Sequence, residues 1–109
     1  MTVPSISVEE AQQLLAADKA VLIDVREQDE WDAAHVEGAT LAPLSAMPQA
    51  WSELNLPTDK TVIVMCKAGG RSARVCQFVG EQTETGHPIL NLEGGIMAWH
   101  QADLPLITG

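Results

Sequence analysis

Thr61-Val62-Ile63-Val64-Met65-Cys66-Lys67-Ala68-Gly69-Gly70-Arg71-Ser72 is the stretch of sequence that decides the fold. Its first five residues, 61–65, are almost entirely apolar and rich in β-branched side chains, which is typical of a strand buried on both faces of a parallel sheet. Residues 72–79 carry apolar side chains at 75, 76 and 79 without a breaker, which predicts a helix. The sequence therefore predicts a strand, a tight glycine-bearing loop and a helix, with Cys66 at the end of the strand.

Cys66 is predicted to lie in an anion-binding loop. Ligands of open α/β sheets bind at the carboxyl ends of the strands, and a loop that leads into a helix directs several backbone N–H groups at one point. Gly69 and Gly70 permit positive φ, so the backbone can curl into an anion-binding nest. Lys67 and Arg71 add positive charge. Because amide donors and cations favour the thiolate, we expect Cys66 to be a nucleophile held as its anion.

Four stretches, in order along the chain, resemble one family. The loop at 66–72 matches the Cys-x-x-Gly-x-Arg-Ser loop of rhodanese-like sulfurtransferases, and the resemblance extends over about residues 6–104. The other matching stretches are 22–27 with Glu30-Trp31, 35–39 and 92–99. Two departures, Ala34 in place of the family's usual Gly and residues 40–43 in place of an Asn-containing segment, affect a turn and a strand more than the chemistry.

The resemblance implies an α/β, rhodanese-like three-layer fold, with a mainly parallel sheet of about five strands and helices on both faces. It also implies sulfur transfer. A persulfide on Cys66 would carry sulfane sulfur from a donor such as thiosulfate to a thiophilic acceptor, cyanide in an assay and a thiol or sulfur-carrier protein in the cell. The covalent persulfide would take the place of any cofactor. The implied active-site loop is Lys67, Ala68, Gly69, Gly70, Arg71 and Ser72.

Two other classes of function stay open. One is a binding or regulatory module without turnover, which the presence of Cys66 and Arg71 disfavours. The other is a phosphatase or arsenate reductase. Four residues separate Cys66 from Arg71, whereas phosphatase-like loops have one more, which widens the loop for a tetrahedral anion. The shorter loop suits a single terminal sulfur and favours sulfur transfer.

Length and charge restrict the partners. A chain of 109 residues predicts a single domain over 1–109. The net charge of −9 argues against nucleic acid and anionic membranes. Three of the six basic residues, Lys67, Arg71 and Arg74, fall in or just after the loop, and this local positive charge suits a small anionic donor. Arg74 is alternatively an ordinary solvated helix residue.

The sequence also predicts a cytoplasmic location. It has no apolar run near the ~20 residues that a spanning helix needs, and its first residues lack the pattern of a signal peptide. Two cysteines do not make a disulfide framework, and a reactive thiol suits a reducing compartment.

Several other side chains are candidates for the site. Asp24 lies near the carboxyl end of the buried-strand run 21–25 and Arg26 follows that run. Both are expected at the same sheet edge as Cys66, either to orient Arg71 and the loop or as a structural ion pair. His35 is interpreted as a turn residue that bonds the backbone rather than as a general base. Cys76 is either a resolving thiol or, as free cysteines more often are, a core residue. The histidines show no metal-ligand spacing with the cysteines, so no metal is expected.

The remaining elements follow from local signals. Ser7 with Glu10 forms a capping-box pattern, which predicts a helix that ends near Asp18. A short helix is expected over 27–34 with Trp31 packed into the core, and Gly86 is a candidate stop for the helix after Cys66. The other expected elements are a short strand at 39–42, a helix from 48 to 54, a last strand at 89–92, and a Gly94-Gly95 loop that walls the site and leads into a short helix.

Overall fold

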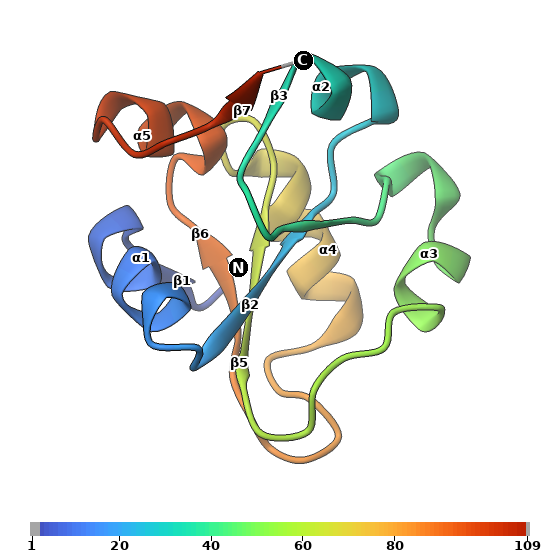
Figure 1. Cartoon of the computed structure of the whole chain (residues 1–109). Coiled ribbons are helices and arrows are strands. Elements are labelled where there is room, and N and C mark those ends of the chain that lie inside the picture. The colour runs from blue at the N-terminus through green and yellow to red at the C-terminus, as the bar shows by residue number, and fades with distance from the viewer. Residues whose placement is uncertain (1–2, 109) are drawn as a thin grey trace.

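The computed structural model describes residues 3–108. Its elements alternate between strands and helices along most of the chain, as the sequence predicts (Figure 1). In order they are β1 (Ser5–Ile6), α1 (Val8–Ala16), β2 (Ala20–Asp24), α2 (Gln28–Ala33), β3 (Ala34–His35), β4 (Thr40–Leu41), a 3₁₀ turn (Leu44–Ala46), α3 (Gln49–Ser52), β5 (Thr61–Met65), α4 (Gly70–Val79), β6 (Ile89–Leu92), α5 (Gly95–Gln101) and β7 (Ile107–Thr108).

A five-stranded sheet forms the middle of the molecule, in the order β1-β6-β5-β2-β4. Each pair of neighbouring strands in it is parallel. β5 is central and pairs with β2 along its whole length, from Ala20 opposite Thr61 to Asp24 opposite Met65. The predicted α/β architecture with a parallel sheet of about five strands is therefore confirmed, and the carboxyl ends of β2 and β5 meet at one edge.

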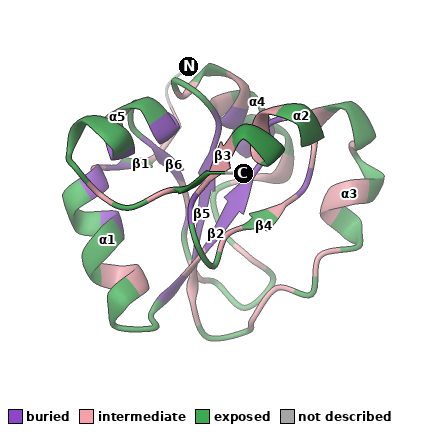
Figure 2. Ribbon diagram, turned by 45° about the horizontal axis from the view of Figure 1, so that its top comes forward, coloured by how far each residue is buried: buried purple, intermediate pink, exposed green. Residues whose placement is uncertain are grey.

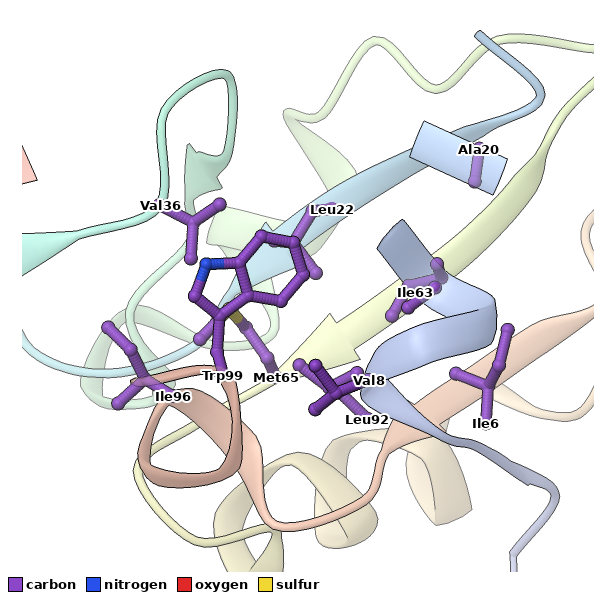
Figure 3. Close-up of a cluster of buried hydrophobic side chains, with 11 residues drawn as sticks. Ile6, Val8, Ala20, Leu22, Val36, Ile63, Met65, Leu92, Ile96 and Trp99 are labelled. Carbon is purple, nitrogen blue, oxygen red and sulfur yellow. The ribbon is translucent and has the colours of Figure 1, made fainter. Parts of the chain in front are cut away.

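Helices cover both faces of this sheet, so the three-layer prediction is also confirmed. α1 and α5 lie on one side, and α3 and α4 lie on the other (Figure 1). On the α1 and α5 side, Trp99 packs in a cluster with Leu22, Met65 and Val36 (Figure 3). On the α4 side, Val75 and Cys76 pack against sheet residues that include Val64. Burying β5 on both faces explains why every residue after Thr61 in it is apolar, and the central strands are the most buried part of the chain (Figure 2).

Helix α1 begins as the capping pattern predicts. The Ser7 hydroxyl accepts a hydrogen bond from the Glu10 backbone N–H at 3.2 Å, which satisfies one of the unpaired amides of the first turn. Val8 and Ala11 form its buried face. The helix ends at Ala16, two residues before the predicted position.

Three local predictions are wrong. α4 ends at Val79, not near Gly86, because Gly80 at φ +99° takes the capping conformation that favours glycine and its N–H bonds to the Cys76 carbonyl. Trp31 is only half-buried, since α2 has no buried residue. β6 is not the last strand, because β7 follows it and pairs antiparallel with β3.

Among residues 3–108, no helix is long and apolar enough to cross a membrane.

Candidate active site

Cys66 is the first residue after β5, at the carboxyl edge of the sheet. Its side chain is almost fully buried, with 1% of its surface exposed, which is deeper than an open loop suggests. The Gly69 backbone N–H nevertheless donates to the Cys66 sulfur at 3.1 Å, and the Ser72 hydroxyl lies 3.4 Å from it. The thiol is therefore buried among apolar residues on one side and faces hydrogen-bond donors on the other.

The environment of the thiol favours its anion. Burial by itself raises the pKa of Cys66, but hydrogen bonds from the Ser72 hydroxyl and from the backbone amides of Ser72, Gly69 and Ala68 outweigh it. The pKa of the thiol consequently lies below its ordinary value. The direction and the amide donors agree with the sequence-based expectation, while the Ser72 hydroxyl, rather than the expected cations, is the largest cause that lowers the pKa of Cys66.

The two loop glycines have different roles. Gly69 caps α4 with φ +109°, a conformation that other residues adopt at a cost, and this turn aims its N–H at the sulfur. Gly70 is the first residue of α4 and does not have a positive φ. The expectation of positive φ at both glycines is therefore correct only for Gly69.

A second glycine turn, Gly94-Gly95, packs directly against the cysteine loop. A Cβ atom on Gly95 would lie 2.3 Å from the Cys66 carbonyl oxygen and 2.6 Å from that of Lys67. In the space that the missing side chain leaves, the Ile96 N–H donates to the Cys66 carbonyl and the Met97 N–H donates to the Lys67 carbonyl. The first turn of α5 thus holds the backbone of Cys66 and Lys67 in place. The Gly94-Gly95 loop forms one wall of the site, as the sequence predicts.

Arg71 is held by Glu30, which lies within one of the matching stretches of sequence but is not among the predicted site residues. The guanidinium donates from Nη1 to Oε1 at 2.6 Å and from Nη2 to Oε2 at 2.8 Å, with both side chains about one-third exposed or less. Glu30 raises the pKa of Arg71 further, and Arg71 lowers the pKa of Glu30 to about 2. Because 41 positions separate the two residues, no spacing rule could have found the pair. Of the predicted cations, Lys67 remains exposed on the loop.

Glu30→Gln is expected to remove a pH-dependent part of the stability. The pKa of Glu30 falls from 4.5 to about 2 on folding, so this contribution is present above pH 4.5 and is lost as the pH falls toward 2. For a partly exposed bidentate pair we expect about 1 kcal/mol at pH 7. Urea unfolding of the wild type and of Glu30→Gln across this pH range measures the difference in their free energies of unfolding. A difference that persists unchanged at pH 2 would contradict the assignment, and Glu84→Gln, at an exposed position, is the matched control.

Asp24 and Arg26 form a buried ion pair of their own. Their side chains are 0% and 5% exposed, and Arg26 Nη2 lies 2.8 Å from Asp24 Oδ2. Arg26 also donates to the carbonyl oxygens of Glu30 and Ala34. Of the two interpretations of this pair, the structural one fits these contacts, because Arg26 anchors the helix that carries Glu30 while Glu30 itself holds Arg71.

The remaining candidates are engaged outside the loop. The His35 Nδ1–H donates to the Trp31 carbonyl oxygen at 2.9 Å, and the two rings stack with their centroids 4.0 Å apart. Cys76 is 3% exposed, and burial raises the pKa of its thiol to about 11, which fits a core residue. Arg74 is exposed on α4, as expected of a solvated residue. Residues 3–108 contain no group of three or more His, Cys, Asp or Glu side chains that could hold a metal ion.

Comparison with known proteins finds the same fold elsewhere. The model of the rhodanese-like domain family matches residues 7–102. A sulfurtransferase of Allochromatium vinosum is 32% identical over 90% of this chain and 88% of its own length. The crystal structure of a thiosulfate sulfurtransferase from Pseudomonas aeruginosa superposes with a TM-score of 0.83 at 30% identity, over 98% of this chain and 20% of that one.

Some relatives are much longer than this chain. MoeZ of Mycobacterium tuberculosis, named a probable adenylyltransferase/sulfurtransferase, is 40% identical over 74% of this chain, but the match spans only 20% of its length. The similarity to MoeZ therefore concerns one part of a larger protein.

Proposed function

The chain belongs to the rhodanese-like domain family, and on that premise we propose that it is a sulfurtransferase that carries sulfane sulfur as a persulfide on Cys66. The observation that carries the proposal is the group of donors around the Cys66 sulfur, with the Gly69 N–H at 3.1 Å and the Ser72 hydroxyl at 3.4 Å. These donors stabilise an anion on sulfur before and after the transfer.

In the first half-reaction the Cys66 thiolate attacks the outer sulfur of the donor. With thiosulfate, a bond forms between the Cys66 sulfur and the outer sulfur of thiosulfate. The sulfur–sulfur bond of thiosulfate breaks at the same time, and its electron pair leaves with sulfite. The outer sulfur becomes the terminal atom of a Cys66 persulfide anion. Charge is conserved, because a thiolate and a thiosulfate dianion become a persulfide anion and a sulfite dianion. The names of relatives, a thiosulfate sulfurtransferase among them, support this donor.

In the second half-reaction a thiophilic acceptor attacks the terminal sulfur. Cyanide takes it as thiocyanate and restores the Cys66 thiolate; a thiol or a sulfur-carrier protein would take the same atom in the cell. The sulfur travels on the enzyme, so the reaction requires no cofactor, and transfer in two separate steps predicts ping-pong kinetics. A reducing compartment such as the cytoplasm would keep Cys66 available between turnovers.

The two cations of the loop have separate roles in this proposal. Arg71 braces the start of α4 through its two hydrogen bonds to Glu30. Because the Glu30 carboxylate offsets the positive charge of Arg71, that charge stabilises an anion on the Cys66 sulfur only weakly. Lys67 is exposed on the rim and is the cation that attracts an anionic donor to a protein of net charge −9.

Intact mass spectrometry tests the proposal directly. After incubation with thiosulfate, the protein is expected to gain the mass of one sulfur atom, and cyanide or a thiol reductant should remove it. Peptide mapping should place the added sulfur on Cys66. No mass gain, together with hydrolysis of a chromogenic aryl phosphate, would replace sulfur transfer by the phosphatase alternative.

A further inference from the structure

Asn91 is a polar residue in the middle of the sheet. It lies in β6, is 8% exposed, and pairs with Ser5 of β1 on one side and with Val64 of β5 on the other. Burying a carboxamide costs free energy unless its polar atoms are hydrogen-bonded. The hydrogen-bond partners of the buried Asn91 carboxamide therefore indicate its role.

Both ends of the Asn91 carboxamide contact the cysteine loop. Its Nδ2 donates to the Gly69 carbonyl oxygen at 3.2 Å, and its Oδ1 accepts from the Ser72 hydroxyl at 2.5 Å. A carbonyl oxygen can only accept, so the Gly69 contact fixes which end of the amide faces which partner. Oδ1 must then face Ser72.

The Ser72 hydroxyl has one proton and three acceptors within reach. They are Asn91 Oδ1 at 2.5 Å, the Gly69 carbonyl at 3.2 Å and the Cys66 sulfur at 3.4 Å. The Gly69 carbonyl already accepts from the Ala73 N–H. A neutral thiol is a weak acceptor, whereas Oδ1 is a strong one. While Cys66 is a thiol, the proton therefore belongs to the bond with Asn91.

We propose that Asn91 is a positioning residue for Cys66: it holds the Ser72 hydroxyl proton while the sulfur is neutral and yields it to the sulfur when the sulfur is an anion. The inference deepens the proposed function, on which it rests, since the thiolate and the persulfide are the anions concerned. When Cys66 loses its proton to solvent, the only other changes are hydrogen bonds. The bond from Ser72 to Oδ1 breaks, and one from Ser72 to the sulfur forms.

Because the Ser72 hydroxyl must give up its bond to Asn91 before it can donate to the sulfur, it stabilises the Cys66 anion less than it would if Asn91 did not compete for its proton. Removing Oδ1 leaves the hydroxyl free for the sulfur and favours the thiolate. Removing the Nδ2 bond to Gly69 has the opposite effect, because it loosens the loop whose N–H also stabilises the sulfur. The direction of the effect therefore separates the proposed role from a purely structural one.

We expect the charged groups around the loop to stay in place when Asn91 is changed. The Ser72 and Gly69 contacts of Asn91 are to neutral groups. Charged side chains on the loop and on the elements next to it include Lys67, Arg71, Arg74, Asp24, Arg26, Asp29, Glu30, Asp32 and Glu93.

A double-mutant cycle measures the coupling between Asn91 and Ser72. The wild type, Asn91→Leu, Ser72→Ala and the double variant are titrated by the ultraviolet absorbance of the thiolate, without any sulfur donor. The pKa of Cys76 is raised to about 11, so the first transition belongs to Cys66. Asn91→Leu is expected to lower the pKa of Cys66 by about half to one unit more when Ser72 is present than when it is alanine.

Equal shifts in the two backgrounds, or a shift upward when Ser72 is present, would overturn the proposal. Asn91→Ala, which cannot overpack the sheet, is carried through the same cycle in case the leucine variant does not fold. Asn55→Leu, at an exposed asparagine, is the matched control and should leave the titration unchanged. Because the measurement needs no turnover, a failure of the sulfur-transfer assay would not affect it.

Discussion

Cys66→Ala is expected to abolish sulfur transfer from thiosulfate to cyanide, a loss of about a thousandfold or more, while the protein still folds. The reason is that the sulfur atom of Cys66 is both the nucleophile and the carrier of the transferred atom. The Gly69 N–H and the Ser72 hydroxyl, which point at that atom, cannot replace it. Thiocyanate formation measures the rate, and circular dichroism checks the fold.

Cys76→Ala is the matched control for this result. Cys76 is a buried residue of α4 and burial raises the pKa of its thiol to about 11, so it offers little thiolate at neutral pH. We expect this variant to keep its sulfur-transfer activity and to lose about 1 kcal/mol of stability through the small cavity. Sulfur transfer that survives in Cys66→Ala and disappears in Cys76→Ala would reverse the assignment of the nucleophile.

Arg26→Ala is expected to lower the free energy of unfolding by about 3–5 kcal/mol. The substitution leaves the Asp24 carboxylate, which is 0% exposed, without its counter-charge, and a buried unpaired charge is costly. It also removes two donors to the carbonyl oxygens of Glu30 and Ala34. Since domains of this size have a free energy of unfolding of only about 5–15 kcal/mol, the midpoint of chemical denaturation should shift to a much lower denaturant concentration.

Two further variants separate the buried charge from other effects. Asp24→Asn combined with Arg26→Met removes both charges and should cost less than Arg26→Ala alone. Lys60→Ala breaks an ion pair of similar length, 2.7 Å to Asp18, at an exposed site and should change the stability little. An equal loss for Arg26→Ala and Lys60→Ala would contradict the role given to burial.

The sequence predicted the frame of the sheet because its signals are local. The runs of β2, β5 and β6 are mostly apolar and each fills a buried parallel strand, because burial on both faces favours apolar residues. The polar exceptions are Asp24, Thr61 and Asn91. The Ser7 cap and the glycines of the two loops are equally local. The strands β1, β3 and β7, in contrast, have two residues each, which is too short for any periodicity to predict.

The end of α4 was predicted wrongly because two glycines near it could each have capped the helix. Gly80 and Gly86 both have a positive φ, and only the register of α4 decided that Gly80 caps it. Trp31, which is predicted to pack in the core, is only half-buried. Its helix lies at the carboxyl edge of the sheet, where its ring stacks on His35 instead.

The sequence by itself determined that a cysteine stands where a buried strand ends, that a glycine turn and a helix follow, and that the fold is an α/β sheet, because all of these depend on neighbours a few residues apart. Only the tertiary structure decided which side chains complete the site. Glu30 reaches Arg71 and Asn91 reaches Ser72 across 41 and 19 positions. Parallel strands return to the same edge through long crossovers, so residues far apart in sequence meet there without leaving any pattern in it.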